Sequence, residues 1–257
     1  MNRREYEIMF RHEDRYFWYR GMRRIARRLV PELFLPSAGR VLDAGAGTGA
    51  NLSHVNDAWA ATPAGSAAPP RSFGIDHAFE AIQFCASRRL PRMSQASAEA
   101  LPFLSESFDL ATSHDVLYCL PDDERACREL FRVLRPGGLL YVTVAAYPWL
   151  YSEHDRATHG LRRYSRADLL GKLARAGFEV ERTTFANAFL LVPIALVRKL
   201  RSLLFAADTR GESVSDFHLA PGPLNGLLDG VLRLEAFLLR FGNLPAGVTL
   251  IARATKR

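Results

Sequence analysis

A glycine-rich turn between a short apolar strand and a helix constrains the fold of this chain most. The turn, Gly45-Ala46-Gly47-Thr48-Gly49, follows a strand predicted over residues 40–44, and a helix is predicted from about Ala50. Glycines let a backbone approach a ligand closely, and a helix N-terminus favours anionic groups. The spacing of Gly45, Gly47 and Ala50 also satisfies the G-x-G-x-x-G/A form of a dinucleotide site. The turn therefore indicates an α/β ligand-binding protein and leaves the ligand open.

Strands and helices alternate along the rest of the chain. Further strands are predicted over residues 72–75, 93–96, 108–113, 139–144, 178–185 and 247–252. This alternation predicts a Rossmann-like α/β fold, in which a seven-stranded, doubly wound parallel sheet carries helices on both faces. We expect one domain, with an N-terminal helical cap (1–38), a core (39–185), a helical insertion (186–246) and a last strand (247–257). Residues 3–30 are predicted as one helical segment, and residues 58–70, rich in Ala and Pro, as a loop.

Charge and cysteine content narrow the functional classes. The net charge is +7, divided into +5 over residues 1–28, −2 over 29–184 and +4 over 185–257. A nucleic-acid-binding protein would more often spread its charge along one surface, so we expect no nucleic-acid partner. Three cysteines without metal-type spacing indicate neither a zinc site nor a disulfide scaffold. The N-terminus lacks the apolar core of a signal peptide, and we expect a cytoplasmic protein.

The position of the acidic residue after the second strand bears on whether the glycine-rich turn is a dinucleotide site. Asp76 lies 31 positions after Gly45, whereas a dinucleotide site places this acid about 20 positions on. The Ala/Pro loop accounts for some of this excess. Motifs further along the chain carry more weight.

Five motifs in order resemble those of class I S-adenosylmethionine (SAM)-dependent methyltransferases. Residues 41–49 (VLDAGAGTG) resemble the D-x-G-x-G-x-G motif, and residues 73–76 (FGID) the motif whose acid holds the ribose hydroxyls. Residues 97–103 (SAEALPF) resemble the adenine-side loop, and residues 108–117 the fourth motif. Residues 132–140 (RVLRPGGLL) resemble the L-x-P-G-G-x-L turn. The motifs span about 100 residues, and the closest similarity is to the ubiquinone-biosynthesis-like branch.

The resemblance implies SAM as cofactor and assigns residues to it. Asp43 belongs to the first motif, Gly45, Ala46, Gly47 and Gly49 would line the methionine portion, and Asp76 would accept hydrogen bonds from the ribose. Ala98 and Glu99 would border the adenine, although Glu99 is equally well interpreted as a surface residue. His114 and Asp115 follow the fourth strand, at the carboxyl edge where this fold binds ligands. His77 would stack on the adenosine or cap the following helix.

The N-terminal segment is interpreted as a cover for the cofactor. In many methyltransferases of this class an N-terminal helix closes over the site, so Arg20 or Arg23 would pair with the methionine carboxylate. Trp18 and Tyr19 would form a wall of the acceptor pocket. The alternative is a helix that packs its aromatic side chains on the core and leaves its arginines in solvent.

A histidine-rich loop after the fifth strand supplies the candidate catalytic residues. Residues 151–164 read YSEHDRATHGLRRY, with His154, His159 and Tyr164 as candidate catalytic groups and Arg163 for an anionic group of the acceptor. A hydroxyl acceptor must lose a proton, and histidine accepts one near neutral pH. The sequence of residues 154–164 (HDRATHGLRRY) resembles a bacterial methyltransferase subgroup. His154, Asp155 and His159 lack a fourth convergent ligand, so no metal is predicted. The alternative is a structural loop held by Arg–carboxylate pairs.

The sequence of the insertion does not identify the methyl acceptor. Its two apolar helical stretches would form a lid over a small-molecule or lipid-like acceptor, a homodimer contact, or a peripheral membrane contact. The sequence thus predicts a SAM-dependent methyltransferase, with oxygen as the favoured acceptor atom. Two alternatives remain: a SAM-binding protein that catalyses dehydration or cyclisation, and a catalytically silent partner of another enzyme.

Overall fold

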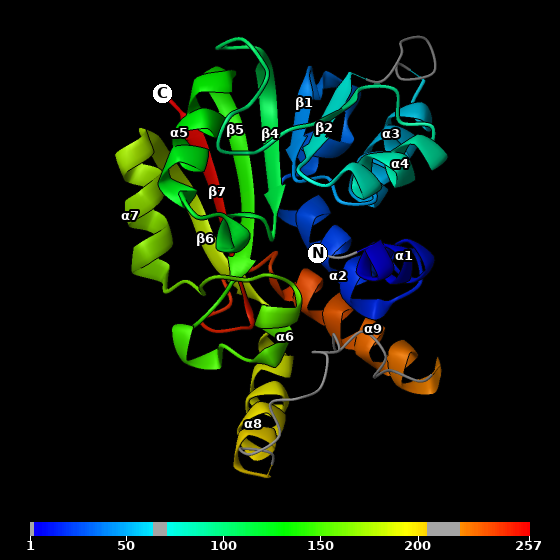
Figure 1. Ribbon diagram of the computed structural model, residues 1–257, viewed down its shortest axis with the longest axis vertical. Helices are drawn as coiled ribbons and strands as arrows, with labels where there is room; N and C mark the ends of the chain where they lie inside the picture. Colours follow the sequence, from blue (N-terminus) through cyan, green and yellow to red (C-terminus); the bar gives the residue numbers. More distant parts are fainter. Residues whose placement is uncertain (1–2, 64–70, 205–221) are drawn as a thin grey trace.

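A seven-stranded mixed β-sheet forms the centre of the molecule (Figure 1). The computed structural model describes residues 3–63, 71–204 and 222–257. The strand order is β3-β2-β1-β4-β5-β7-β6, and the strands are β1 (Val41–Ala44), β2 (Ser72–Asp76), β3 (Met93–Gln95), β4 (Phe108–His114), β5 (Leu134–Ala145), β6 (Phe178–Ala186) and β7 (Thr249–Lys256). The predicted Rossmann-like, doubly wound fold is confirmed. The sheet is not wholly parallel, because β7 runs antiparallel to both β5 and β6.

Helices cover both faces of this sheet. They are α1 (Arg3–His12), α2 (Phe17–Leu29), α3 (Ala50–Ala60), α4 (Phe79–Ser87), α5 (Asp123–Val133), α6 (Glu153–Ala157), α7 (Arg166–Ala176), α8 (Ala188–Leu204) and α9 (Gly222–Leu238). Short 3-10 turns are η1 (Pro31–Phe34), η2 (Pro36–Ala38), η4 (Leu117–Cys119) and η5 (Pro148–Leu150). Alternate strand residues point to opposite faces. Leu42 and Leu140 therefore join a core with α5 and α7, while Val41 and Tyr141 join a second core with α2, α3 and α9.

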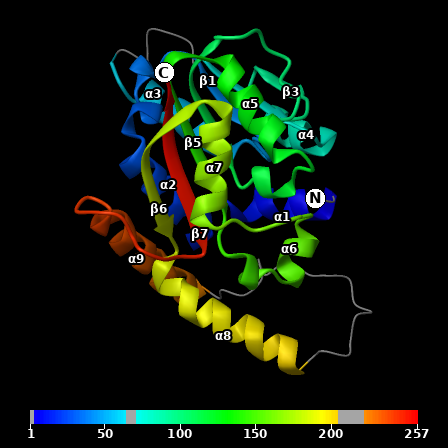
Figure 2. The ribbon, with the colours of Figure 1, turned by 90° about the vertical axis from the view of Figure 1, so that its left-hand side faces the viewer.

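The insertion leaves and re-enters the sheet at one point. β6 and β7 pair as antiparallel neighbours up to Ala186 and Thr249, so α8 and α9 together replace a hairpin turn. Both helices lie beyond the carboxyl ends of β4 and β5, at the lower edge of the molecule in Figures 1 and 2. β7 ends at Lys256 rather than at the predicted residue 252, because it pairs with β6 along its whole length.

The N-terminal segment is two helices rather than the single predicted one. The chain breaks between α1 and α2 at residues 13–16. At this corner Arg23 donates a hydrogen bond from Nη2 to the main-chain oxygen of Glu13, at 2.7 Å, and the Glu13 side chain is buried. In one continuous helix Glu13 would belong to the polar side that faces solvent. Its carboxylate is instead buried, and the chain turns at this residue. Parts of the predicted loop (64–70) and of the linker inside the insertion (205–221) lie outside the described residues.

α9 packs closely on α2. A Cβ atom on Gly21 would lie 2.2 Å from Cδ1 of Leu232, so a glycine is needed where the two helices approach. Arg24 of α2 also donates to Asp229 of α9, at 2.7 Å. The insertion and the N-terminal cap therefore form one continuous wall beside the sheet.

Candidate active site

A cavity of about 700 Å³ lies at the carboxyl ends of the strands, between the sheet, the cap and the insertion. This is where an open α/β sheet binds its ligands, and the volume is in the ordinary range for a ligand pocket. Of the residues predicted for the site, the cavity is lined by Trp18, Tyr19, Gly45, Ala46, Gly47, Asp76, His77, Ala98, His114, Asp115, His154 and Arg163. It is not lined by Arg20, Asp43, Gly49, Glu99, His159 or Tyr164.

The glycine turn forms the floor of the cavity at the end of β1. Gly45 has φ +98°, and a Cβ atom there would lie 2.1 Å from Cγ2 of Val116. Gly49 has φ +84° and caps the N-terminus of α3, away from the cavity lining. Asp43 lies beneath the turn, where its carboxylate accepts a hydrogen bond from Thr112 Oγ1 at 2.8 Å. Because Asp43 is fully buried, the pKa of its carboxyl is raised, and its hydrogen bond with Thr112 joins β1 to β4.

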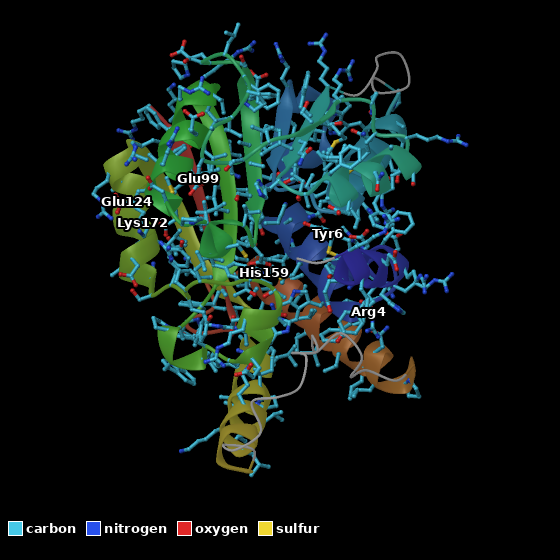
Figure 3. All side chains as sticks on the ribbon, in the orientation of Figure 1. Arg4, Tyr6, Glu99, Glu124, His159 and Lys172 are labelled. Carbon is cyan, nitrogen blue, oxygen red and sulfur yellow. The ribbon has the colours of Figure 1, made fainter. Side chains whose placement is uncertain are left out.

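Asp76 directs its carboxylate to the same end of the cavity. Its Oδ2 accepts from the Gly47 amide at 2.9 Å, which joins the end of β2 to the turn after β1. Its Oδ1 accepts from the Ala78 amide at 3.0 Å and from the Tyr6 hydroxyl at 3.3 Å. Tyr6, labelled in Figure 3, belongs to α1, so this hydrogen bond joins the cap to the end of β2.

A buried cluster of charges at the α1–α2 corner was not predicted. The Glu13 carboxylate accepts from Thr48 Oγ1 and from Arg88 Nη2, the latter at 2.7 Å, and burial raises its pKa. Arg23 is 9% exposed and lines the cavity, and its Nη1 is buried with no hydrogen-bond partner among the described residues. Burial lowers the pKa of this guanidinium. The helical periodicity of the sequence does not predict that Glu13 is buried, because no pattern in the neighbouring residues shows that the chain turns there.

Arg20 does not take the predicted role. Its side chain is partly exposed and pairs with Asp229 of α9, with 3.7 Å between Nε and Oδ1. It therefore joins cap to insertion outside the cavity. Of the two arginines considered from the sequence, Arg23 is the one that reaches the cavity.

Glu99 anchors the adenine-side loop without lining the cavity. Its Oε1 accepts from the Asp122 amide at 2.6 Å, just before α5, so Glu99 lies on the α5 side of the sheet, apart from Tyr6 (Figure 3). Ala98, its neighbour, is buried in the cavity wall. His77 lies at the exposed rim.

The far half of the cavity is aromatic and apolar. Trp18 and Tyr19 face Tyr118 across it, and the inner side of α8 adds Leu190 and Ile194. Burial raises the pKa of Tyr19 well above its ordinary value. Cys119 also lines the wall, and burial raises the pKa of its thiol to about 11, so it is protonated at neutral pH.

Asp115 stands between the two halves of the cavity. It follows β4 with φ +54°, and its amide donates to the Thr143 carbonyl at 3.0 Å, which fixes it at the carboxyl edge. Burial raises the pKa of its carboxyl, although the neighbouring His114 works against this shift. His114 lines the cavity beside it.

Some residues of the histidine-rich loop line the cavity and others lie outside it. His154, in α6, lines the cavity. Arg163 also lines it, and its guanidinium pairs with Asp155 at 2.8 Å and donates to the Ala146 carbonyl at 3.0 Å. His159 has φ +59° and is exposed outside the cavity. The three predicted catalytic residues are therefore not brought together.

Tyr164 is a buried structural group. Its hydroxyl donates to the Asp123 carboxylate, which also accepts from Lys172 Nζ at 2.8 Å. Burial alone would raise the pKa of Asp123, but the hydrogen bonds from Lys172 and Tyr164 lower it. Within the described ranges, no group of three or more His, Cys, Asp or Glu side chains is arranged to hold a metal ion. Across those ranges, too, no helix is both long and apolar enough to cross a bilayer.

Comparison with known proteins places a methyltransferase domain in this chain. Residues 42–142 match the methyltransferase domain family. The chain is 31% identical over 144 residues to phthiotriol/phenolphthiotriol dimycocerosates methyltransferase 1 of Mycobacterium ulcerans, covering 54% of this chain and 50% of that protein. It is 32% identical over 126 residues to a ubiquinone/menaquinone biosynthesis C-methyltransferase of Syntrophotalea carbinolica, covering 46% and 49%. The chain thus spans about half the length of these curated relatives.

Solved structures share the fold. A SAM-dependent methyltransferase of Thermotoga maritima, described as a possible histamine N-methyltransferase, superposes with a TM-score of 0.58 at 19% identity, covering 99% of this chain and 96% of that one. At this identity the likeness establishes the fold alone. The matched residues 42–142 contain the glycine turn, Asp76 and Asp115, so the matching segment forms one side of the cavity.

Proposed function

We propose that this chain transfers a methyl group from SAM to a small or lipid-like acceptor, with oxygen as the favoured acceptor atom. The observation that carries the proposal is the single cavity that joins Asp76 and the glycine turn to His154 and the apolar face of α8. Its cofactor half lies within the methyltransferase domain, and its other half is built by the cap and the insertion.

The residues of the cofactor half fit SAM. Asp76 would accept hydrogen bonds from the ribose hydroxyls, and Gly45 and Gly47 leave room for the methionine portion. His77 and Ala98 would border the adenine. The buried Nη1 of Arg23, without a partner among the described residues, fits the methionine carboxylate, because a buried guanidinium nitrogen needs an acceptor.

SAM would supply a methyl group on a sulfonium centre, which an acceptor displaces in line. The chain's own residues mainly position the acceptor and exclude water. Trp18, Tyr19 and Tyr118 enclose the space between the glycine turn and α8. His154 would accept the proton that a hydroxyl acceptor loses, and Arg163, although paired with Asp155, would attract an anionic group of the acceptor.

The acceptor is proposed to have a large apolar part. The inner side of α8 contributes Leu190, Ile194 and Val197 to the cavity, and α9 contributes Leu228. The similarity to proteins named for phthiotriol dimycocerosates and for ubiquinone/menaquinone supports this proposal. We also propose that the sequence pattern of residues 154–164 is typical of one subgroup of methyltransferases.

Methyl transfer is tested with SAM labelled in its methyl group and a panel of phenols, hydroxylated long-chain amphiphiles and amines. We expect labelled product from a hydroxylated apolar acceptor, identified by mass spectrometry. Tight binding of SAM with no labelled product from any class would contradict methyl transfer and favour a different use of the cofactor, such as dehydration or cyclisation.

The proposed base is tested separately. His154→Ala should lower kcat while leaving SAM affinity unchanged, because the imidazole lies in the acceptor half of the cavity. His159→Ala is the matched control, since His159 is exposed outside the cavity. Unchanged kcat in His154→Ala would remove the general-base role.

A further inference from the structure

The outer side of α8 is apolar and exposed. Phe189, Val192, Leu196 and Leu200 follow one another at intervals of three and four residues, which places them on one side of the helix, and Leu196 is 62% exposed. Leu190, Ile194 and Val197, on the adjoining side, already line the cavity. A helix with apolar residues on most of its sides is ordinarily buried in a protein or in lipid. In Figures 1 and 2, α8 instead extends away from the sheet.

α9 carries a second exposed apolar stripe. Leu227, Leu234, Phe237 and the following Phe241 recur at nearly whole helical turns, and Phe241 is 74% exposed. The buried side of α9, with Leu232 and Leu239, already satisfies the packing against α2 and the sheet. The exposed stripe therefore contributes nothing to the core.

In the described parts of α8 and α9, the charged side chains that are exposed are basic. Asp229 and Glu235, the acidic residues among the described part of α8 and α9, are both buried. Arg233, which also pairs with Asp229 at 3.0 Å, and Arg240 lie along one border of the α9 stripe. A shallow hollow between α2 and α9 is lined by Arg24, Arg27, Arg28, Ala236, Phe237 and Arg240, with no acidic side chain.

An exposed tryptophan lies next to the base of α8. Trp149, in η5, is 65% exposed, and the carbonyl of the adjoining Leu150 accepts a hydrogen bond from Arg198 of α8 at 2.6 Å. Tryptophan is enriched where proteins meet the interfacial region of a bilayer. Trp149 is therefore a further exposed side chain of interfacial type beside α8, apart from the stripe that contains Leu196.

We propose that the outer faces of α8 and α9 form a docking surface for an anionic phospholipid bilayer. Apolar side chains bordered by arginine suit the boundary between acyl chains and anionic headgroups. A second copy of the chain is a poorer occupant, because a two-fold interface sets each patch against itself and would bring arginine borders of like charge together.

Docking would also bring α8, which lines the cavity, to the lipid. Leu190, Ile194 and Val197 line the cavity from the side of α8 that adjoins the exposed stripe, and Val197 is itself 49% exposed, so α8 lies between the acceptor space and the docked surface. This inference goes beyond the proposed methyl transfer, and its test requires no turnover.

Flotation of the full chain with vesicles tests the proposal. We expect flotation with vesicles of phosphatidylcholine and phosphatidylglycerol, weak flotation with phosphatidylcholine alone, and release by salt. The double variant Leu196→Ser with Phe237→Ser should bind roughly tenfold or more weakly, because two apolar side chains lose their burial in lipid. Arg240→Glu should weaken binding to the anionic vesicles by roughly tenfold.

Matched controls use residues on other surfaces. Leu104→Ser changes an apolar side chain that is 82% exposed in the loop before β4, and Arg166→Glu changes an exposed arginine at the start of α7. Both should float as the wild type does. Because all these side chains are exposed, thermal unfolding midpoints should remain unchanged, which confirms folding.

Three results would overturn the proposal. The first is wild-type protein that does not float with anionic vesicles. The second is a double variant that floats as well as Leu104→Ser. The third is a wild-type dimer in sedimentation equilibrium that the double variant abolishes and that vesicles do not dissociate. None of these results bears on methyl transfer, so the two proposals fail independently.

Discussion

At the scale of single residues, Arg23 has the most unusual environment in the cavity. One nitrogen of its guanidinium donates to the Glu13 carbonyl, while the other is buried without a partner among the described residues. Leaving a charged donor unpaired costs more than leaving a neutral one unpaired. A carboxylate ligand would remove that cost, which supports the proposed place of the methionine carboxylate beside Arg23.

Arg23→Gln should therefore weaken the binding of S-adenosylhomocysteine by about ten- to a hundredfold, the equivalent of one charge-assisted hydrogen bond. Isothermal titration calorimetry measures this directly. Arg20→Gln, outside the cavity, should bind normally. 5′-Methylthioadenosine, which lacks the amino-acid portion, should bind the wild type and Arg23→Gln alike; an equal loss for both ligands would show that Arg23 does not contact the carboxylate.

Tyr164 shows how far residue type alone can mislead. A tyrosine in a loop over the predicted active site was a reasonable catalytic candidate, yet its hydroxyl donates to Asp123 on the α5 side. Tyr164→Phe should lower the free energy of unfolding by about 1–3 kcal/mol, because Asp123 loses a buried donor. Urea unfolding measures this loss, and kcat should stay unchanged. A fall in kcat without a loss of stability would return the hydroxyl to the chemistry.

At the scale of elements, the sequence predicts what depends on local pattern. Short apolar runs predict the strands, and Gly177, at φ +104°, ends α7 in the left-handed conformation that glycine adopts readily. The break between α1 and α2 was missed because it depends on Glu13 meeting Thr48 and Arg88, which lie far along the chain. Such a contact leaves no periodic signal.

The start of α8 depends on another distant contact. Glu235 of α9 accepts from the Asn187 amide at 2.6 Å and from the Phe189 amide at 3.0 Å, and so caps the helix from across the insertion. Its carboxylate is fully buried, and burial raises its pKa although the amide donors lower it. A carboxylate at a helix N-terminus also interacts favourably with the helix dipole.

Glu235→Gln should lower the free energy of unfolding at neutral pH by about 1–3 kcal/mol, because an amide donor then faces the backbone amides. In the wild type the folded state binds the Glu235 proton more tightly than the unfolded chain, for which 4.5 is the ordinary pKa. Stability from this group therefore rises as pH falls from neutral towards the raised pKa.

The variant lacks this titration, so the gap between wild type and Glu235→Gln should widen as pH is lowered from 7 towards 5. Urea unfolding at several pH values measures the gap. Glu106→Gln, at an exposed position, should follow the wild type. Parallel pH profiles for wild type and Glu235→Gln would show that the Glu235 carboxyl does not titrate differently on folding.

At the scale of the whole molecule, the two halves of the cavity differ in how well the sequence predicts them. Gly45, Gly47 and Asp76 come from consecutive strand ends, so motif spacing places them together. The acceptor half joins Trp18, His154 and Ile194, which belong to the cap, a loop and the insertion. Their meeting depends on how α2 packs on α9, through Gly21 and Leu232, and no local pattern contains that information.

This arrangement couples the cap to the proposed cofactor site. Tyr6 and Met9 of α1 reach Asp76 and Gly47, so opening α1 would uncover that site. Saturating S-adenosylhomocysteine, at about a hundred times its Kd, stabilises the closed state by about 2.7 kcal/mol. Amide hydrogen exchange in α1 should then slow by up to about a hundredfold, as mass spectrometry of its peptides would record. Local hydrogen exchange in α7, which packs with α5 against the opposite face of the sheet from α2, should be unaffected. Protection confined to residues 45–49 and 76–78 would mean that α1 opens without releasing the ligand.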